Sequence, residues 1–235
     1  MIQDKLSGLS IFFPAYNEGQ NIAATIRDAL TYAPKVAEEF EIIVVDDGST
    51  DETAAIVADI AKANPSIRLV RHTQNRGYGA AVKTGLKNAK YPWIFFTDAD
   101  RQFHFDELPH FVSLREKAEV IVGRRLKRRD PILRIILAQI LLKYWNLLLF
   151  GLWMKDVDCA YKLIPTKYVK KMTLVTESAI TVTEMMVKLK RMGLTFYETP
   201  VTHFSRRKGI QTGSNPRVIF RAFAESFKLW KELQK

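Results

Sequence analysis

The feature that most constrains the fold is the alternation of short apolar runs with helix-forming segments through the first hundred residues. Apolar runs cover residues 9–13, 41–45, 67–71 and 93–97, and segments with helical patterning separate them. Strands that are apolar along most of their length are typical of parallel sheets that helices cover on both faces. The pattern therefore predicts an α/β fold with a mostly parallel central sheet flanked by helices.

The second half of the chain is less regular but continues the same fold. We expect one domain over residues 1–235, because no repeat, low-complexity tract or linker interrupts the chain and 47% of it is hydrophobic. The helices that we expect cover residues 22–30, 51–63 (with Ser49 or Thr50 as its cap), 77–89, 180–192 and 217–233, and two further strands cover residues 157–164 and 194–198.

Polar turns follow three of the four early strands. They are Tyr16-Asn17-Glu18, Asp46-Asp47-Gly48-Ser49 and Asp98-Ala99-Asp100. Ligands of open parallel sheets bind beyond the carboxyl ends of the strands. We therefore expect these three turns to converge on one edge of the sheet and to form the functional site.

The pair Asp98 and Asp100 predicts a metal site. Two carboxylates one residue apart at a strand end point beyond the sheet, and Gln102 adds a neutral oxygen. Mg²⁺ or Mn²⁺ usually combines one or two carboxylates with substrate phosphates. The alternative for an Asp-x-Asp sequence is a surface turn with capping aspartates, and the two other polar turns at the same edge favour the metal.

The other turns are suited to a nucleotide. A carboxylate of Asp46 or Asp47 can accept the N–H of a uracil or guanine base, and the next helix N-terminus supplies free backbone donors. Tyr16 offers a stacking face and Glu18 can bind a hydroxyl. Glycines in Asn75-Arg76-Gly77-Tyr78-Gly79 allow close backbone approach at a helix start. The alternative for the Asp46 turn is a well-capped strand–turn–helix connection, which is compatible with ligand binding.

Net charge indicates an anionic partner. The chain has 36 Lys+Arg against 25 Asp+Glu, a net charge of +11. A phosphate-bearing substrate and an anionic membrane surface both fit, and so does a solvated basic face. A non-enzymatic protein that binds nucleic acid or another polyanion fits poorly, because it leaves the acidic edge unexplained. The basic residues form two clusters, Arg124, Arg125, Lys127, Arg128, Arg129 and Arg134, and Arg206, Arg207, Lys208, Arg217 and Arg221.

Residues 132–154 predict a helical segment that lies in a membrane interface. The segment is nearly long enough to span a bilayer, but Lys143 in its middle is costly in lipid. Trp145 and Trp153 suit the headgroup level. An ordinary core helix with a solvated stripe is the alternative. No apolar run precedes Leu9, so we expect no signal peptide, and the single cysteine, Cys159, is compatible with the cytosol.

The order and spacing of the motifs resemble family 2 glycosyltransferases with a GT-A fold. The matching segments are FFPAYNE, VVDDGSTD, NRGYGAAVKTG, FFTDADRQF, VIVGRR, DVDCAYKLI and HFSRRKGIQTG. Within that family the chain is most similar to dolichol-phosphate mannose synthase and bacterial polyprenyl-phosphate glycosyltransferases. The C-terminal transmembrane segments typical of that subgroup have no counterpart after Phe227, so we expect no transmembrane domain.

The resemblance implies an inverting transfer of sugar from a UDP- or GDP-sugar to a polyprenyl or dolichyl phosphate, on the cytoplasmic face of a membrane. It implies Mg²⁺ or Mn²⁺ as the cofactor, and the sequence identifies no membrane-protein partner. The residues implied to bind the metal are Asp98, Asp100 and Gln102, and those implied in catalysis are Asp100, Arg125 and Arg134. The residues implied to bind the nucleotide-sugar donor are Pro14, Tyr16, Glu18, Asp46, Asp47, Arg76, Gly77, Asp98 and Asp100. The residues implied to bind the acceptor phosphate are Arg124, Arg125, Arg134 and Arg206.

The acceptor remains open between a phosphate and a hydroxyl. A phosphate is already anionic at neutral pH and needs cations to hold it, whereas a hydroxyl needs a general base. Arginines beside an apolar segment suit the phosphate, and Asp156 and Asp158 are candidate bases for a hydroxyl of a glycan or another lipid. Lys162 and Ala160 replace the arginine and glycine that are frequent in the lipid-phosphate subgroup, and Gln211-Thr212-Gly213 replaces its serine–lysine pair.

Overall fold

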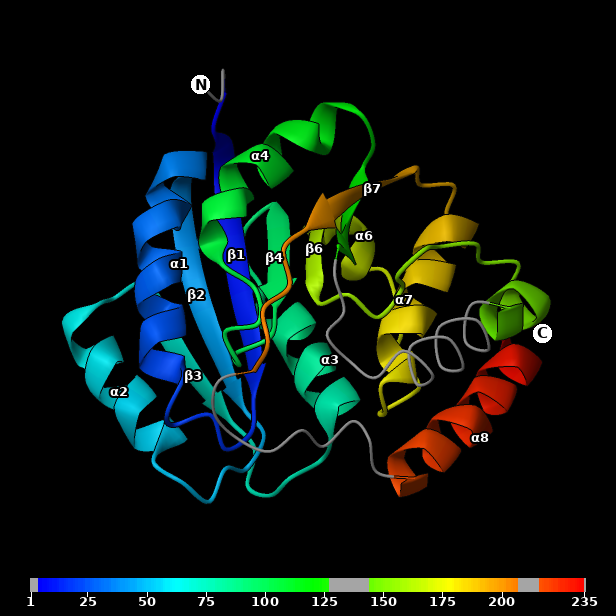
Figure 1. Cartoon of the computed structure of the whole chain (residues 1–235), viewed down its shortest axis with the longest axis horizontal. Helices are drawn as coiled ribbons and strands as arrows, with labels where there is room; N and C mark the ends of the chain where they lie inside the picture. Colours follow the sequence, from blue (N-terminus) through cyan, green and yellow to red (C-terminus); the bar gives the residue numbers. More distant parts are fainter. Residues whose placement is uncertain (1–3, 127–143, 207–215, 235) are drawn as a thin grey trace.

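A computed structural model describes residues 4–126, 144–206 and 216–234. Within these residues a seven-stranded sheet has the order β3-β2-β1-β4-β6-β5-β7, with helices packed around it (Figure 1). The strands are β1 (Leu6–Ala15), β2 (Ala37–Asp46), β3 (Ile67–Arg71), β4 (Trp93–Thr97), β5 (Val120–Arg125), β6 (Tyr161–Pro165) and β7 (Phe196–Val201).

Most neighbouring strands are parallel, as predicted. β1 is parallel to both β2 and β4, β3 is parallel to β2, and β7 is parallel to β5. Among the strands of the described ranges, only β6 is antiparallel to its neighbours, β4 and β5. Because β1, β2 and β4 are adjacent and parallel, their carboxyl ends lie together at one edge of the sheet.

The helices form two groups. α1 packs with α2 and α4, whereas α3 packs with α7, and α7 packs with α8. In Figure 1 the red helix α8 lies at the outer side of α7, far from α1 and α2. The helix bounds are α1 (Ile22–Val36), α2 (Thr53–Ala63), α3 (Tyr78–Asn88), α4 (Leu108–Ser113), α6 (Thr166–Val169), α7 (Ile180–Arg191) and α8 (Pro216–Leu233), and residues 144–150 are also helical.

Aromatic side chains fill the core beneath the polar edge. Phe12 on β1 stacks on Phe96 on β4 with ring centroids 5.2 Å apart. On the same strand Phe95 makes edge-to-face contacts with Phe105 and Tyr161. These side chains are fully or almost fully buried, and buried aromatics contribute more than any other residue type to core stability. The rigid strands beneath the edge therefore hold its turns in place.

The segment predicted for a membrane interface is described only from residue 144 onward, and residues 132–143 lie outside the described part. Trp145 packs against α8, where its Nε1 donates to Ser226 Oγ at 2.9 Å and its ring contacts Phe223 and Phe227. Trp153, in contrast, is 51% exposed. None of the helices in the described ranges is long and apolar enough to cross a membrane.

Candidate active site

Side-chain hydrogen bonds join the turn after β1 to the turn after β2. Asn17 N donates to Ser49 Oγ, and Glu18 N donates to Thr53 Oγ1, both at 2.9 Å. Thr50 N donates to Asn17 Oδ1 at 2.9 Å. The prediction that Ser49 or Thr50 caps the following helix is wrong, because both residues hold the neighbouring turn and α2 begins only at Thr53.

Asp46 and Asp47 are buried and fasten the loops around them. Asp47 accepts hydrogen bonds from Arg76 N at 3.0 Å and Gly77 N at 2.8 Å. Asp46 Oδ1 accepts from Ser49 N at 3.0 Å, and its Oδ2 lies 2.9 Å from Arg71 Nε. The structure therefore brings together Asp47, Arg76 and Gly77, which were predicted to bind the donor. Their contact with a nucleotide stays a prediction.

Asp98 and Asp100 form the turn after β4. Asp98 Oδ1 accepts from the Tyr78 hydroxyl at 3.0 Å, and Asp100 Oδ1 accepts from Gln102 N at 3.0 Å. Thr25 Oγ1 on α1 donates to Ala99 O at 3.0 Å. Arg101 has φ of 61°, a left-handed conformation that is uncommon outside glycine. Such backbone persists only where its surroundings fix it, so the turn is tightly specified.

The two carboxylates of this turn resist ionisation. Burial and the neighbouring Asp100 raise the pKa of Asp98 to about 7, although a hydrogen bond from Tyr78 and the charge of Arg125 act in the opposite direction. Burial likewise raises the pKa of Asp100. A cation between the two groups would relieve this cost. The carboxylate oxygens of Asp98 and Asp100 therefore fit Mg²⁺ or Mn²⁺.

Asp98 and Asp100 leave further coordination positions of a bound Mg²⁺ or Mn²⁺ to other oxygens. The described ranges contain no group of three or more His, Cys, Asp or Glu side chains that could hold a metal ion. Mg²⁺ commonly takes one or two protein carboxylates and completes its shell with water and substrate phosphates. The Gln102 Nε2 donates to Phe204 O at 3.0 Å, and a role of its Oε1 as a third metal ligand stays a prediction.

Arg206 lies in the middle of this edge. It forms an ion pair with Glu18, and its Nη1 is 3.7 Å from Asp100 Oδ2. Burial raises the pKa of Glu18, while hydrogen bonds from Asn21 and Arg206 lower it. Tyr16 exposes 37% of its surface beside these groups, and Pro14 is buried at the end of β1. The residues from β1 and β4 therefore share one polar edge with an arginine from the chain after β7.

Arg125 is held at the end of β5. Its Nε and Nη2 form a two-point ion pair with Asp156 at 2.7 and 2.6 Å. Both carboxylate oxygens of Asp156, a candidate base, therefore contact the Arg125 guanidinium. Asp158, in the same loop, is exposed. Arg124 is half-buried beside Arg125, and Arg134 lies outside the described residues. Of the arginines predicted to bind the acceptor phosphate, the structure therefore describes Arg124, Arg125 and Arg206.

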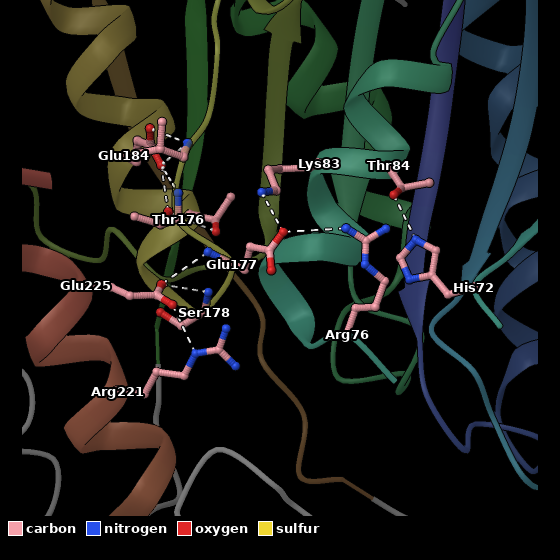
Figure 2. Close-up of polar contacts among 12 residues, drawn as sticks. His72, Arg76, Lys83, Thr84, Thr176, Glu177, Ser178, Glu184, Arg221 and Glu225 are labelled. Carbon is pink, nitrogen blue, oxygen red and sulfur yellow. Dashed lines mark hydrogen bonds and ion pairs between the residues drawn. The ribbon is translucent and has the colours of Figure 1, made fainter. Parts of the chain in front are cut away.

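Three residues that contribute to the site were not predicted as site residues. His72 is buried, and its Nδ1 lies 2.6 Å from Asp47 Oδ1. Its Nε2 lies 2.9 Å from Thr84 Oγ1 (Figure 2). Tyr78 contacts Asp98 as described above. Lys162 is fully buried and donates to the carbonyls of Val157 and Cys159, which shapes the loop that carries Asp156. His72 and Tyr78 could have been found from their positions at the carboxyl end of β3 and the start of α3.

The fold is that of GT-A glycosyltransferases. Glucosyl-3-phosphoglycerate synthase from Mycobacterium tuberculosis, solved with phosphoglyceric acid, aligns with a TM-score of 0.71 at 17% identity over 96% of this chain and 80% of that one. Mannosyltransferase PcManGT from Pyrobaculum calidifontis, solved with GDP-Man and Mn²⁺, aligns with a TM-score of 0.67 at 18% identity over 97% of this chain and 66% of that one. At such identities the likeness shows the fold alone.

The chain belongs to glycosyl transferase family 2, whose sequence model matches residues 10–169. The dolichyl-phosphate beta-glucosyltransferase of Dictyostelium discoideum is 31% identical over 173 residues, covering 66% of this chain and 53% of that protein. The undecaprenyl-phosphate 4-deoxy-4-formamido-L-arabinose transferase of Photorhabdus laumondii is 31% identical over 134 residues, covering 56% of this chain and 41% of that protein. This chain thus spans about half the length of these two relatives.

The raised pKa of Asp98 predicts a pH-dependent penalty on folding when no divalent cation is bound. Between its ordinary value near 3.8 and about 7, the unfolded chain ionises Asp98 but the folded chain does not. Stability should therefore fall as pH rises through this window, by up to about 1.4 kcal/mol per pH unit from this group, and level off above it.

Urea unfolding of the wild type and Asp98→Asn in excess chelator isolates the effect of this carboxylate. The variant should gain stability relative to the wild type between pH 5 and pH 8, because Asn cannot ionise. A stability difference that is independent of pH would show that Asp98 ionises normally in the folded protein.

Proposed function

We propose that this chain is a metal-dependent, inverting glycosyltransferase that moves a sugar from a UDP- or GDP-sugar to a polyprenyl or dolichyl phosphate. The observation that carries the proposal is the shared edge of β1, β2 and β4, which gathers Asp47, Asp98 and Asp100 with Arg76. The family, and relatives named as dolichyl- and undecaprenyl-phosphate transferases, support the same reaction.

The acidic turn suits the donor diphosphate. Mg²⁺ or Mn²⁺, when bound by Asp98 and Asp100, supplies positive charge that stabilises the diphosphate leaving group. The mannosyltransferase from Pyrobaculum calidifontis was solved with both Mn²⁺ and GDP-Man, which supports a divalent cofactor here. In this proposal Tyr16 and the Asp47 loop hold the nucleoside beside that diphosphate. Direct positioning of the reacting groups then supplies much of the rate enhancement.

The cations beside β5 suit a phosphate acceptor. A phosphate monoester is anionic at neutral pH and attacks without a general base if it is held in line. Arg125 presents a partly buried guanidinium at the edge. Its positive charge acts on Asp98, where it opposes the rise in pKa that burial and Asp100 cause. Asp156 is engaged by that guanidinium, which argues against it as a base for a hydroxyl. Arg134 is proposed as the second phosphate ligand.

A hydroxyl acceptor is the second candidate. The observation that favours it is Asp158, an exposed carboxylate in the loop that also carries Asp156. In that case Asp158 would take the proton from an attacking hydroxyl, and the Arg125–Asp156 pair would only shape the loop. The acceptor variants below separate the two candidates.

We propose that the chain acts at the cytoplasmic face of a membrane, and an exposed apolar patch supports binding to a membrane surface. The patch comprises Tyr144, Leu147, Leu148, Trp153 and Phe227, with exposed fractions of 37–80%. The Tyr144 and Trp153 rings are 6.3 Å apart, and Trp145 joins this segment to Phe227. Exposed Lys155, Lys228 and Lys231 lie in the same segments. Apolar side chains beside lysines are suited to anionic lipid surfaces.

Replacement of Asp100 tests the metal assignment. Asp100→Ala should abolish sugar transfer, because it removes one of two carboxylates of the turn. The fold should persist, since no apolar core contact is lost. Turnover with Mn²⁺ and thermal unfolding are the measurements, and Asp59→Ala, which removes an exposed carboxylate of α2, is the control. Full activity of Asp100→Ala in the presence of chelator would refute the metal role.

Replacement of Arg125 tests the acceptor. Arg125→Ala should lower transfer to a short polyprenyl phosphate about tenfold to a hundredfold, because a charge-assisted hydrogen bond to a fixed anion is lost. Nucleotide affinity should change little. Arg125→Lys should rescue only in part, since lysine cannot make the planar two-point contact.

The Arg125→Gln/Asp156→Asn double variant controls for the ion pair that Arg125→Ala removes from the buried Asp156 carboxylate. Equal losses of turnover and nucleotide affinity would place Arg125 on the donor diphosphate. Unchanged turnover together with inactivation by Asp158→Asn would favour the hydroxyl acceptor.

Liposome sedimentation tests the membrane proposal. Wild-type protein should bind vesicles containing phosphatidylglycerol and bind more weakly as salt rises, because ions screen the lysines. Leu148→Ser/Trp153→Ser should reduce the binding that remains at high salt, since that part depends on the apolar patch. Equal binding of wild type and variant at high salt, or equal binding to neutral and anionic vesicles, would contradict the proposal.

A further inference from the structure

Glu177 lies between the donor edge and the C-terminal helix, and the proposed chemistry gives it no role. Its Oε1 accepts from Lys83 Nζ at 3.1 Å and lies 3.5 Å from Arg76 Nη2. Figure 2 shows the carboxylate of Glu177 pointing toward both cations of the α3 region. Arg76 is the same residue whose backbone N donates to Asp47 at the nucleotide edge.

The loop of residues 175–178 that carries Glu177 is fastened from α7. Glu184, which is fully buried, accepts from Val175 N and Thr176 N, both at 2.9 Å, and from Thr176 Oγ1 at 2.6 Å. Lys188 Nζ balances its charge at 2.5 Å. A buried carboxylate with this many donors is costly to disturb, so it fixes the loop in one conformation.

The same loop is fastened from α8. Glu225 Oε2 accepts from Glu177 N at 3.1 Å and from Ser178 N at 2.9 Å (Figure 2). Its other oxygen accepts from Arg221 Nε at 3.0 Å. The loop is therefore held by carboxylates from two different helices, and the Glu177 side chain projects from a fixed backbone toward α3.

Close packing sets the distance between this loop and α3. A Cβ at Gly79 would lie 2.4 Å from Ser178 O and 2.1 Å from Thr181 Oγ1. Only glycine allows the first turn of α3 to approach so closely. Gly77 precedes it with φ of 98°, and its N donates to Asp47. This packing thus fixes the distance between the Glu177 loop and the loop that carries Arg76.

We propose that Glu177 is a positioning residue that holds the Arg76 side chain against the donor nucleotide. This inference rests on the proposed function, because it assumes that the Asp47 edge binds a nucleoside diphosphate. The Arg76 side chain is 49% exposed, so a free guanidinium there would sample many rotamers. The Glu177 carboxylate restricts that freedom before the donor arrives, and pre-organisation of this kind improves affinity.

The sign of the effect separates positioning from plain electrostatics. A nucleoside diphosphate is strongly anionic, so removal of a nearby carboxylate by charge alone would tighten its binding. Removal of a positioning carboxylate instead weakens binding, because Arg76 loses its fixed orientation. Glu177→Gln, which keeps the shape of the side chain, therefore gives opposite results under the two explanations.

The experiment is calorimetric titration of UDP and GDP, each with Mn²⁺, into the full chain. We expect Glu177→Gln to weaken binding of the preferred nucleotide about five- to tenfold. In turnover the KM for the donor should rise while kcat changes less than about twofold. Arg76→Gln should weaken binding at least as much, and Glu177→Gln should add nothing further in the Arg76→Gln background.

Glu116→Gln, at an exposed carboxylate of the 3-10 turn after α4, is the matched control and should bind like the wild type. Thermal unfolding of every variant shows whether the loop remains folded. Equal or tighter binding by Glu177→Gln, or additive losses in the double variant, would overturn the inference while leaving the proposed function intact. A wild type that binds neither nucleotide would overturn the proposed function and this inference together.

Discussion

The structure depends on the parallel pairing of β1 with β2 and β4, which brings like charges together at one edge. Burial makes the ionisation of these carboxylates costly and their mutual repulsion adds to that cost, as the raised pKa of Asp98, buried beside Asp100, shows. The aromatic core beneath them, with Phe12 stacked on Phe96, stabilises the sheet that holds them there. A bound cation offsets the repulsion between these carboxylates, and the same cation can hold an anionic ligand at the edge.

Much of the fold follows from local patterns in the sequence. The first four strands were predicted from apolar runs because most of their residues are apolar, and their order in the chain led directly to the shared edge. β5 was not identified as a strand, although its segment carries Arg125. α2 begins later than expected because Ser49 and Thr50 bond across to Asn17, a contact 32 or more residues away that helix-capping rules cannot anticipate.

The site was predictable where a strand end marks it and not where distant segments meet. Asp98, Asp100 and Asp47 are placed by the strands that precede them. The pairing of Arg125 with Asp156, and of Glu177 with Arg76 and Lys83, joins residues 31 to 101 positions apart. Such pairs depend on how β5, α3 and α7 pack. Sequence patterns within one element carry no information about that packing.

Sugar transfer to a lipid phosphate is the central claim, and a donor panel tests it most directly. Purified protein would be incubated with Mn²⁺, undecaprenyl phosphate and UDP- or GDP-linked hexoses, and the lipid fraction analysed by mass spectrometry. We predict a lipid-phosphate-linked sugar with one donor, of inverted anomeric configuration, and none in chelator. A product bearing the sugar on a hydroxyl, a product that forms equally in chelator, or no lipid product with any donor would contradict the claim.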